Sequence, residues 1–420
     1  MKKNSKRQRR KRKLILFIIE IIILILVAGA LFVYSKLDLI KSKKLDDTKV
    51  GKNEVSEETQ KTFEGYTTIA CFGLDNREQG VYESGNSDVI MLMNINNDTH
   101  EVSLMSVYRD TYLNVAGEGQ EEKFQKANAA YAYGGPEQAV TMLNRNLDID
   151  IDNYVAFDFK AVAQAIDILG GVDIDVESEE ERKYLNDYVS YTSQYVGGSD
   201  EEVEHTGLQT LNGVQAVSYA RIRYTAGDDY KRAERQRRVL TEMIKKAKSA
   251  SLTELNSLIN TVFPQISTDL DKKDIISMAT VMIKYDMANS GGFPYSKDTF
   301  TPSKSIGSVV APCDLESNVI ELHKRLYGTD NYTPSETVKK YSEHIVDVSG
   351  YTAEWKADNR FSGQDEFFGN GTDRQPMMDP VNRRNTNRMM RLFICPVNAG
   401  WDAYCFKYGT SGGMFSNATV

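Results

Sequence analysis

The chain has 420 residues with 51 Lys or Arg and 59 Asp or Glu, which gives a formal net charge of −8 at neutral pH. An acidic chain of this kind is a poor partner for nucleic acid. Its four cysteines are too few for a disulfide-built fold, and its four scattered histidines disfavour a His/Cys zinc site.

The N-terminus combines a basic tail with a long apolar run. Nine of residues 1–13 are Lys or Arg, and Glu20 is the only charge in residues 14–34. A run of this length spans the bilayer core of about 30 Å, and the basic tail stays in the cytoplasm. We therefore predict a single-pass cell membrane protein with an extracytoplasmic C-terminal body. The alternative, a cleaved signal peptide, usually has an apolar region of only about 7–15 residues.

Beyond the membrane span, residues 35–65 are charged and lack a sustained apolar period, and they predict a stalk that is partly helical. Apolar runs at residues 66–74, 89–95 and 101–107 then predict three strands of one sheet. The turn-forming residues 96–100 between the last two strands predict a hairpin.

Helical and extended patterns alternate after the hairpin. We predict strands over residues 154–157, 172–176 and 305–311, and helices over 136–147, 160–169, 212–220, 229–249, 252–262, 273–287, 315–327 and 334–345. Residues 177–205, rich in Glu, Tyr, Ser and Gly, predict a long surface excursion. The alternation predicts an α/β domain over residues 66–346 with a mixed sheet flanked by helices.

The segment at residues 347–420 has no amphipathic period and predicts a poorly ordered extracellular tail. Cys395 and Cys405 could form a disulfide across a short loop within it, whereas Cys71 lies in an apolar run and is expected to be a buried thiol.

Common catalytic signatures are missing from the sequence: it has no P-loop, no G-x-S-x-G, no H-E-x-x-H and no CxxC pair. Charged residues instead follow or precede the first three predicted strands. Asp75 follows the first strand, Asp88 precedes the second and Arg109 follows the third, so antiparallel pairing would bring them to one sheet edge. Two neighbouring carboxylates favour a divalent cation such as Mg²⁺. Loop or cap residues are the alternative interpretation.

A second charged segment reads YARIRYTAGDDYKRAERQRRVL. Arg221 and Arg223 would point the same way if they were extended, and Arg232, Arg235 and Gln236 would share a face near the start of a helix. Arginine binds phosphate through two parallel hydrogen bonds and keeps its charge. The segment therefore predicts an anion site, with a solvated basic helix face as the alternative.

Several motifs in order resemble the LytR-CpsA-Psr family of cell-envelope proteins. They include CFGLDNR, SDVIMLMNIN, SLMSVYRDTY, KANAAYAYGG, FDFKAVAQAIDILGGVDIDV, GLQTLNGVQAVSYARIR and DYKRAERQR. The resemblance covers roughly residues 66–251 and continues more loosely to about residue 345. The usual PRD of the family is Tyr108-Arg109-Asp110 in this chain, which removes a proline and keeps the arginine.

The resemblance implies an α-β-α sandwich and an enzyme that moves a glycopolymer from an undecaprenyl pyrophosphate carrier to peptidoglycan. It implies Mg²⁺ at Asp75 and Asp88. Further positions matching the family's phosphate-contacting or nearby polar residues are Arg109, Lys126, Arg221, Arg223, Asp229, Arg232 and Gln236. An apolar tunnel for the lipid is also implied, although the same apolar residues would serve as core.

We expect phosphoryl transfer in which arginines and metal neutralise the pyrophosphate while an acceptor hydroxyl attacks. Arg109, Asp110 and Asp229 are the predicted catalytic residues, and the sequence leaves open whether Asp110 or Asp229 is the base. Two alternatives remain at this point: a polyprenyl pyrophosphate hydrolase, and a non-catalytic envelope sensor or transcriptional attenuator. The identity of the polymer, whether teichoic acid, capsule or another glycan, is also open.

Overall fold

The computed structural model describes residues 41–74, 82, 85–223 and 228–354. Several predictions concern residues outside this part of the chain: the basic N-terminal tail and membrane span at residues 1–34, the metal ligand Asp75, and the cysteines Cys395 and Cys405. Within the described part, no helix is both long enough and apolar enough to cross a bilayer.

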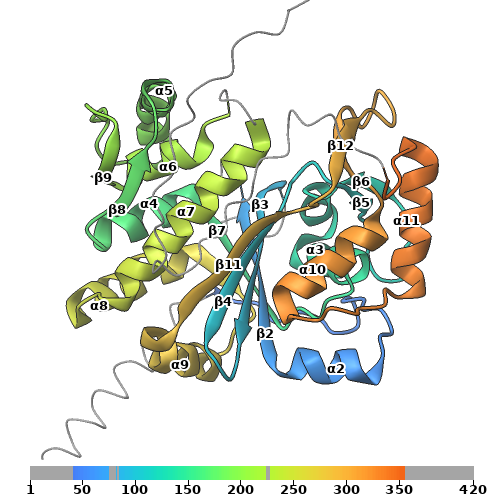
Figure 1. Ribbon diagram of the computed structural model, residues 1–420. Coiled ribbons are helices and arrows are strands. Elements are labelled where there is room, and N and C mark those ends of the chain that lie inside the picture. The colour runs from blue at the N-terminus through green and yellow to red at the C-terminus, as the bar shows by residue number, and fades with distance from the viewer. Residues whose placement is uncertain (1–40, 75–81, 83–84, 224–227, 355–420) are drawn as a thin grey trace, which may run out of the picture. The chain divides into compact units, whose positions relative to one another are not determined.

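Among the described residues, seven strands form one mixed sheet in the order β1-β10-β7-β2-β3-β4-β11 (Figure 1). The strands are β1 (Lys41–Ser42), β2 (Tyr66–Leu74), β3 (Ser87–Asn96), β4 (Glu101–Val107), β7 (Asn153–Asp158), β10 (Ile266–Thr268) and β11 (Asp286–Phe293). β2, β3 and β4 are antiparallel neighbours, as predicted, whereas β7 and β11 run parallel to β2 and β4. The predicted mixed sheet is confirmed.

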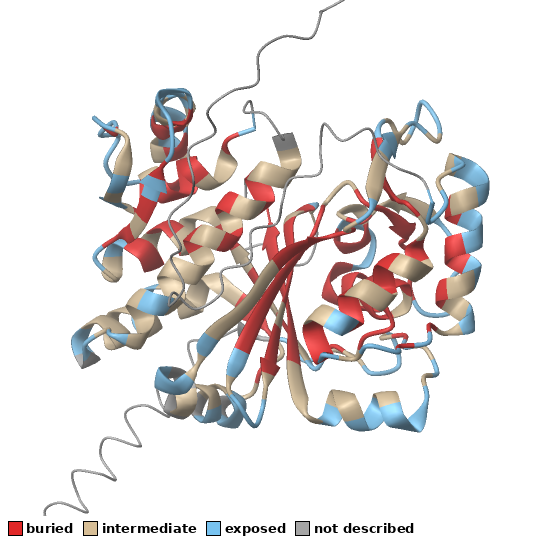
Figure 2. Ribbon diagram, in the orientation of Figure 1, coloured by how far each residue is buried: buried red, intermediate tan, exposed pale blue. Residues whose placement is uncertain are grey.

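Helices cover both faces of this sheet, and Figure 2 shows burial concentrated in the strands between them. One face packs against α3 (Ala129–Leu147), α10 (Leu315–Tyr327) and α11 (Glu336–Ser349). The other face packs against α7 (Asp228–Lys248) and α9 (Lys272–Val281), while α4 (Phe159–Ile168) packs mainly with α6 (Gly213–Arg221). Strand residues alternate between the two layers, because successive side chains point to opposite faces: Phe72 lies in the first core and Cys71 in the second.

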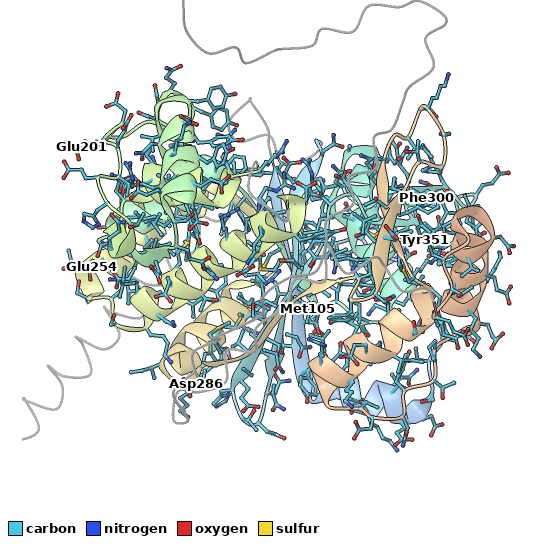
Figure 3. All side chains as sticks on the ribbon, turned by 45° about the horizontal axis from the view of Figure 1, so that its top comes forward. Met105, Glu201, Glu254, Asp286, Phe300 and Tyr351 are labelled. Atoms are coloured by element: carbon cyan, nitrogen blue, oxygen red, sulfur yellow. The ribbon has the colours of Figure 1, made fainter. Side chains whose placement is uncertain are left out.

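The first core is the larger and is rich in aromatic residues. Met105, labelled near the middle of the sheet in Figure 3, accepts a hydrogen bond from the Tyr295 hydroxyl at 3.2 Å. Phe300 and Tyr351 lie beside each other in the same view, with ring centroids 6.1 Å apart and an edge-to-face arrangement. Cys71 in the second core is buried, as predicted, and burial raises the pKa of its thiol to about 12.

A satellite layer contains the segment that was predicted as a surface excursion. That prediction is wrong, since α5 (Glu179–Val196) occupies most of residues 177–205. Ser178 caps the helix by accepting the Glu181 backbone N–H, and Leu185 and Val189 are buried at helical spacing. The helix packs with α6 (Gly213–Arg221), β8 (Val172–Val176) and β9 (Gly207–Leu211) around a separate small core. Its buried stripe is too sparse to stand out among polar residues.

Two other predicted helices differ in extent. α3 begins at Ala129, and Gly135 at φ +66° interrupts it before Pro136 restarts the helix. Residues 273–287 form α9, a short turn and then the start of β11 rather than one helix. The remaining elements are α2 (Glu57–Glu64), α8 (Leu252–Thr261), β5 (Tyr112–Asn114), β6 (Phe124–Lys126), β12 (Lys297–Phe300) and β13 (Val309–Pro312).

The predicted stalk is helical in part, as predicted, since α2 covers Glu57–Glu64, but residues 43–65 pack onto the domain rather than standing apart from it. Leu45, Val50 and Phe63 contact the first core, and the Gly51 N–H donates to Thr141 Oγ1 at 2.9 Å. These apolar residues are irregularly spaced, so no helical or extended period reveals them. The domain therefore starts more than twenty residues earlier than the sequence predicted.

His323 provides a test of the packing between α10 and the first core. It is 1% exposed, stacks on Tyr332 with ring centroids 3.5 Å apart, and has Nε2 3.0 Å from the Leu147 carbonyl oxygen. Burial outweighs the nearby Asp148 charge and lowers the pKa of His323 from 6.5 to about 4.

Below pH 6.5 His323 binds a proton in the unfolded chain but stays neutral in the folded chain. The free energy of unfolding therefore decreases as the pH falls from about 6.5 to about 4. We expect roughly 2 kcal/mol of the free energy of unfolding to disappear between pH 7 and pH 4.5. Urea unfolding of the full-length chain should show this loss for wild type and for the exposed control His344→Gln, but not for His323→Gln. Equal pH slopes in all three proteins would contradict the assignment.

Candidate functional site

Arg109 and Asp88 meet at one edge of the sheet, where β3 begins and β4 has ended. The antiparallel register pairs Met91 with Ser106, which brings the two strand ends together. Arg109 Nη1 lies 3.0 Å from Asp88 Oδ1, and both side chains are mostly buried. The predicted convergence of these two strand-end residues is confirmed.

The first turn of α7 adds a carboxylate and a second buried arginine. Asp229 Oδ1 lies 3.0 Å from Arg232 Nη1, and Asp229 Oδ2 lies 3.7 Å from Arg109 Nη2. Arg223, in the link between α6 and α7, reaches Asp88 Oδ2 at 3.5 Å. Asp88 and Asp229 thus hold three arginines from distant parts of the chain in one network.

Asp110 extends this network toward β6. Its Oδ1 lies 3.1 Å from Lys126 Nζ, and its Oδ2 lies 3.6 Å from Arg109 Nε. The short β5–β6 ladder places Lys126 opposite Tyr112, two residues after Asp110. We call the seven residues of the network the charge cluster: Asp88, Arg109, Asp110, Lys126, Arg223, Asp229 and Arg232.

Among the described residues, two buried arginine nitrogens of the charge cluster have carboxylate neighbours but make no hydrogen bond. A small pocket is lined by Asp88, Arg109, Asp229, Arg232 and Gln236. Among the described residues, no hydrogen-bond acceptor is in place for Arg109 Nε or Arg232 Nη1, although carboxylates lie near both. Since a buried donor without an acceptor costs free energy, these groups are poised to bind an oxygen-rich anion.

The charges of the cluster explain its preference for an anion. Burial and the neighbouring Arg109 lower the pKa of Arg232 to about 10. Burial would raise the pKa of Asp229, but Arg232 and Arg109 outweigh it and hold that pKa below its usual range. Burial also opposes the Arg109 charge, yet Asp88, Asp229 and Asp110 raise its pKa. Among the described residues of the cluster, four cations face three carboxylates, so this set is short of negative charge.

Two predicted anion-binding residues do not join the cluster. Arg221 is the last residue of α6 rather than part of a strand, so the predicted alternation with Arg223 does not apply. Arg235 is 5% exposed and pairs instead with Glu181 of α5, at 2.7 Å between Nε and Oε1. Gln236 does line the pocket, and its amide nitrogen donates to the Ala220 carbonyl at 3.5 Å.

Sequence reasoning missed a wall of the site made by Tyr108, Tyr230 and Lys297. The two tyrosine rings pack edge to face with centroids 4.7 Å apart, and Lys297 Nζ lies 5.2 Å and 4.8 Å from them. A Cβ atom at Gly292 on β11 would overlap the Tyr108 hydroxyl. The tyrosine side chain therefore fits at this position only because residue 292 is glycine. Tyr108 at the position of the family's proline was the available signal, whereas nothing in the sequence points to Lys297.

The donor set at Asp88 fits a magnesium ion. Each of its carboxylate oxygens faces one arginine, which leaves a lone pair on each for a metal. Leu74 pairs with Ser87, so the chain leaves β2 next to Asp88 on its way to Asp75, which lies outside the described residues. Within the described ranges, no group of three or more His, Cys, Asp or Glu residues is arranged around a common metal position.

The chain is similar to known proteins in sequence and in fold. Residues 30–290 match the family model described as the LytR_cpsA_psr family. A polyisoprenyl-teichoic acid–peptidoglycan teichoic acid transferase, TagU of Enterococcus faecalis, is 29% identical over 50% of this chain and 64% of its own length. The transferase TagT of Bacillus subtilis is 28% identical over 60% of this chain and 76% of its own length.

The fold has solved counterparts. Protein gbs0355 from Streptococcus agalactiae superposes with a TM-score of 0.53 and 23% identity, covering 68% of this chain and 95% of that one. The match covers a mixed α/β fold with a central sheet flanked by helices.

Arg232 and Arg235 form a matched pair for testing the site, because both are 5% exposed and lie one helical turn apart. Arg232→Met removes a charge that burial disfavours, and Asp229 keeps Arg109 as a partner. We expect its free energy of unfolding to stay within about 1 kcal/mol of wild type or to rise. Arg235→Met leaves the buried carboxylate of Glu181 without its partner and should lower the free energy of unfolding by about 3–5 kcal/mol.

Thermal unfolding with and without inorganic pyrophosphate measures both effects. The anion should raise the melting temperature of wild type and of Arg235→Met, because it binds the folded state, and should not raise that of Arg232→Met. Strong destabilisation by Arg232→Met together with an intact pyrophosphate response would refute the anion site.

Proposed function

This chain belongs to the LytR-CpsA-Psr family, and on that premise we propose that it is a phosphotransferase. It moves a glycopolymer, such as teichoic acid or capsule, from an undecaprenyl pyrophosphate carrier to peptidoglycan and forms a phosphodiester. The observation that carries this proposal is the pair of arginines Arg109 and Arg232, which lie mostly buried beside each other and each keep a nitrogen that makes no hydrogen bond among the described residues. A diphosphate supplies both the oxygens and the charge.

In the proposed reaction, Arg109, Arg232 and Arg223 hold the diphosphate, and Lys126 stands at its edge. A hydroxyl of the peptidoglycan glycan attacks the phosphorus that bears the polymer sugar. The new O–P bond replaces the bond to the bridging oxygen, and the lipid phosphate leaves. Fixed guanidinium groups stabilise the charge of the transition state without having to reorganise.

Asp110 is our choice for the base that accepts the proton of the attacking hydroxyl. Asp229 is bound by Arg232 and Arg109, and its lowered pKa makes it a weak base. Its carboxyl group also contacts that of Asp110. We assign Asp229 the role of positioning the two arginines, and Asp110, which pairs with Lys126 and Arg109, the role of proton acceptor.

The lipid part of the donor would follow α7 away from the charge cluster. Arg232 and Gln236 line the pocket, and Leu240 and Ile244 continue at the same four-residue spacing into the second core. This face of the helix thus changes from polar to apolar along its length. We propose that the prenyl chain lies along this apolar part and that residues 14–34 anchor the chain in the membrane that holds the donor.

We further propose that Mg²⁺ binds Asp88 and Asp75, where it would neutralise phosphate charge during transfer. Transfer should fall at least about tenfold in EDTA and recover with added Mg²⁺. Asp88→Asn should raise the Mg²⁺ concentration needed for half-maximal rate, because one ligand charge is lost. A rate that is unchanged after chelation would remove the metal from the mechanism.

The test of the function uses the full-length chain in detergent with a lipid-linked glycopolymer and peptidoglycan fragments. Arg109→Met and Arg232→Met should reduce the rate of conjugate formation by at least about 100-fold, since each removes charge stabilisation worth about 3 kcal/mol. Arg182→Ala, on a partly exposed arginine paired with Glu179 outside the cluster, is the control.

Product analysis identifies the reaction. A peptidoglycan conjugate with a phosphodiester supports the proposal, whereas free phosphorylated polymer would identify a pyrophosphate hydrolase. If neither product forms while the pyrophosphate lipid binds, the chain is a non-catalytic envelope sensor and the proposal fails.

A further inference from the structure

The guanidinium of Arg221 is surrounded by aromatic rings outside the charge cluster. Its central carbon lies 5.1 Å from the ring centroid of Tyr191, 5.3 Å from that of Phe159 and 5.8 Å from that of Tyr188. Nη1 donates to Thr192 Oγ1 at 3.3 Å. Arg223 and Arg235 pair with Asp88 and Glu181, whereas among the described residues no carboxylate forms an ion pair with Arg221, so its charge faces the π faces of the rings.

Part of this aromatic group is open to solvent. Tyr191 is 54% exposed, whereas Phe159, Tyr188 and Arg221 are partly buried. Tyr188 and Tyr191 lie at i and i+3 on α5 and therefore share a face of that helix. A large aromatic ring that is held in place by a neighbouring arginine yet remains half exposed offers a fixed apolar surface for a ligand.

The chain connects this surface directly to the charge cluster. Arg221 is followed by Ile222, which is fully buried, and then by Arg223, whose guanidinium reaches Asp88. Two residues span at most about 7 Å, so the aromatic group begins one short step from the proposed diphosphate position.

We infer that Arg221, Phe159, Tyr188 and Tyr191 form a subsite for the first sugar of the donor glycan, the one bonded to the diphosphate. The apolar C–H face of a pyranose ring packs on Tyr191, and sugar hydroxyls accept hydrogen bonds from Arg221. This inference rests on the proposed function.

Binding of two lipid probes to the full-length chain in detergent tests the subsite. One probe is polyprenyl pyrophosphate, and the other is the same lipid carrying a single N-acetylhexosamine. Tyr191→Ala should weaken binding of the sugar-bearing probe about tenfold, which corresponds to about 1.4 kcal/mol for one stacked ring. Its affinity for the sugar-free probe should stay within about twofold of wild type.

Further variants separate stacking from folding. Tyr191→Phe should bind both probes like wild type, and Tyr191→Leu, which keeps apolar bulk but lacks the ring, should behave like Tyr191→Ala. The control is Tyr133→Ala, because Tyr133 is 48% exposed and also contacts a cation, with Lys123 Nζ 3.8 Å from its ring centroid. This variant should bind both probes like wild type.

Each outcome separates the subsite from the wider function. If wild type fails to bind the sugar-free probe, the proposed function itself fails. If wild type binds that probe but Tyr191→Ala weakens both probes equally or neither, the sugar subsite is overturned. A rise in KM for the peptidoglycan acceptor with unchanged probe binding would also overturn it, because the surface would then serve the acceptor.

Discussion

The burial of excess positive charge at the edge of the sheet is the constraint on which the site depends. Arg109 and Arg232 repel each other, and burial and that repulsion lower the pKa of Arg232 to about 10. Asp88 and Asp229 offset only part of the cost, because the cluster remains short of negative charge. Such an arrangement persists only if the surrounding structure is rigid, and the buried central strands and the long helix α7 supply that rigidity.

The helix α7 joins the different parts of the molecule. Its first turn carries Asp229 and Arg232, its next turn ties Arg235 to Glu181 in the satellite layer, and Leu240 and Ile244 pack on the sheet. The buried Arg235–Glu181 pair therefore fixes the position of α5 relative to the charge cluster. Because Tyr188 and Tyr191 lie on α5, the same pair also fixes the aromatic surface around Arg221. Arg235 thus sets the geometry next to the charge cluster without belonging to it.

Much of the fold could be predicted from the sequence, and the seven residues of the charge cluster were all named there, whereas the wall of Tyr108, Tyr230 and Lys297 was not. The strands around residues 66–107 have strong apolar runs and a clear turn, so their pairing and the meeting of Asp88 with Arg109 followed directly. The placement of Arg221 could not be predicted, because whether it ends a helix or begins a strand depends on the packing of α6 against α4 and α5. Lys297 comes from β12, and no local pattern links it to Tyr108 nearly two hundred residues earlier.

The packing of Tyr108 over Gly292 also bears on how the molecule is made. β4 is formed early in the chain, but its second neighbour, β11, and the wall residue Lys297 come from the last third of the domain. At the other end of the sheet, β1 likewise pairs with β10, which comes much later in the chain. Contacts between such distant segments form slowly, since a long loop must close first. A chain synthesised from its N-terminus therefore carries all seven residues of the charge cluster before it has β11 and Lys297, and the wall beside the cluster is completed only when the domain is nearly complete.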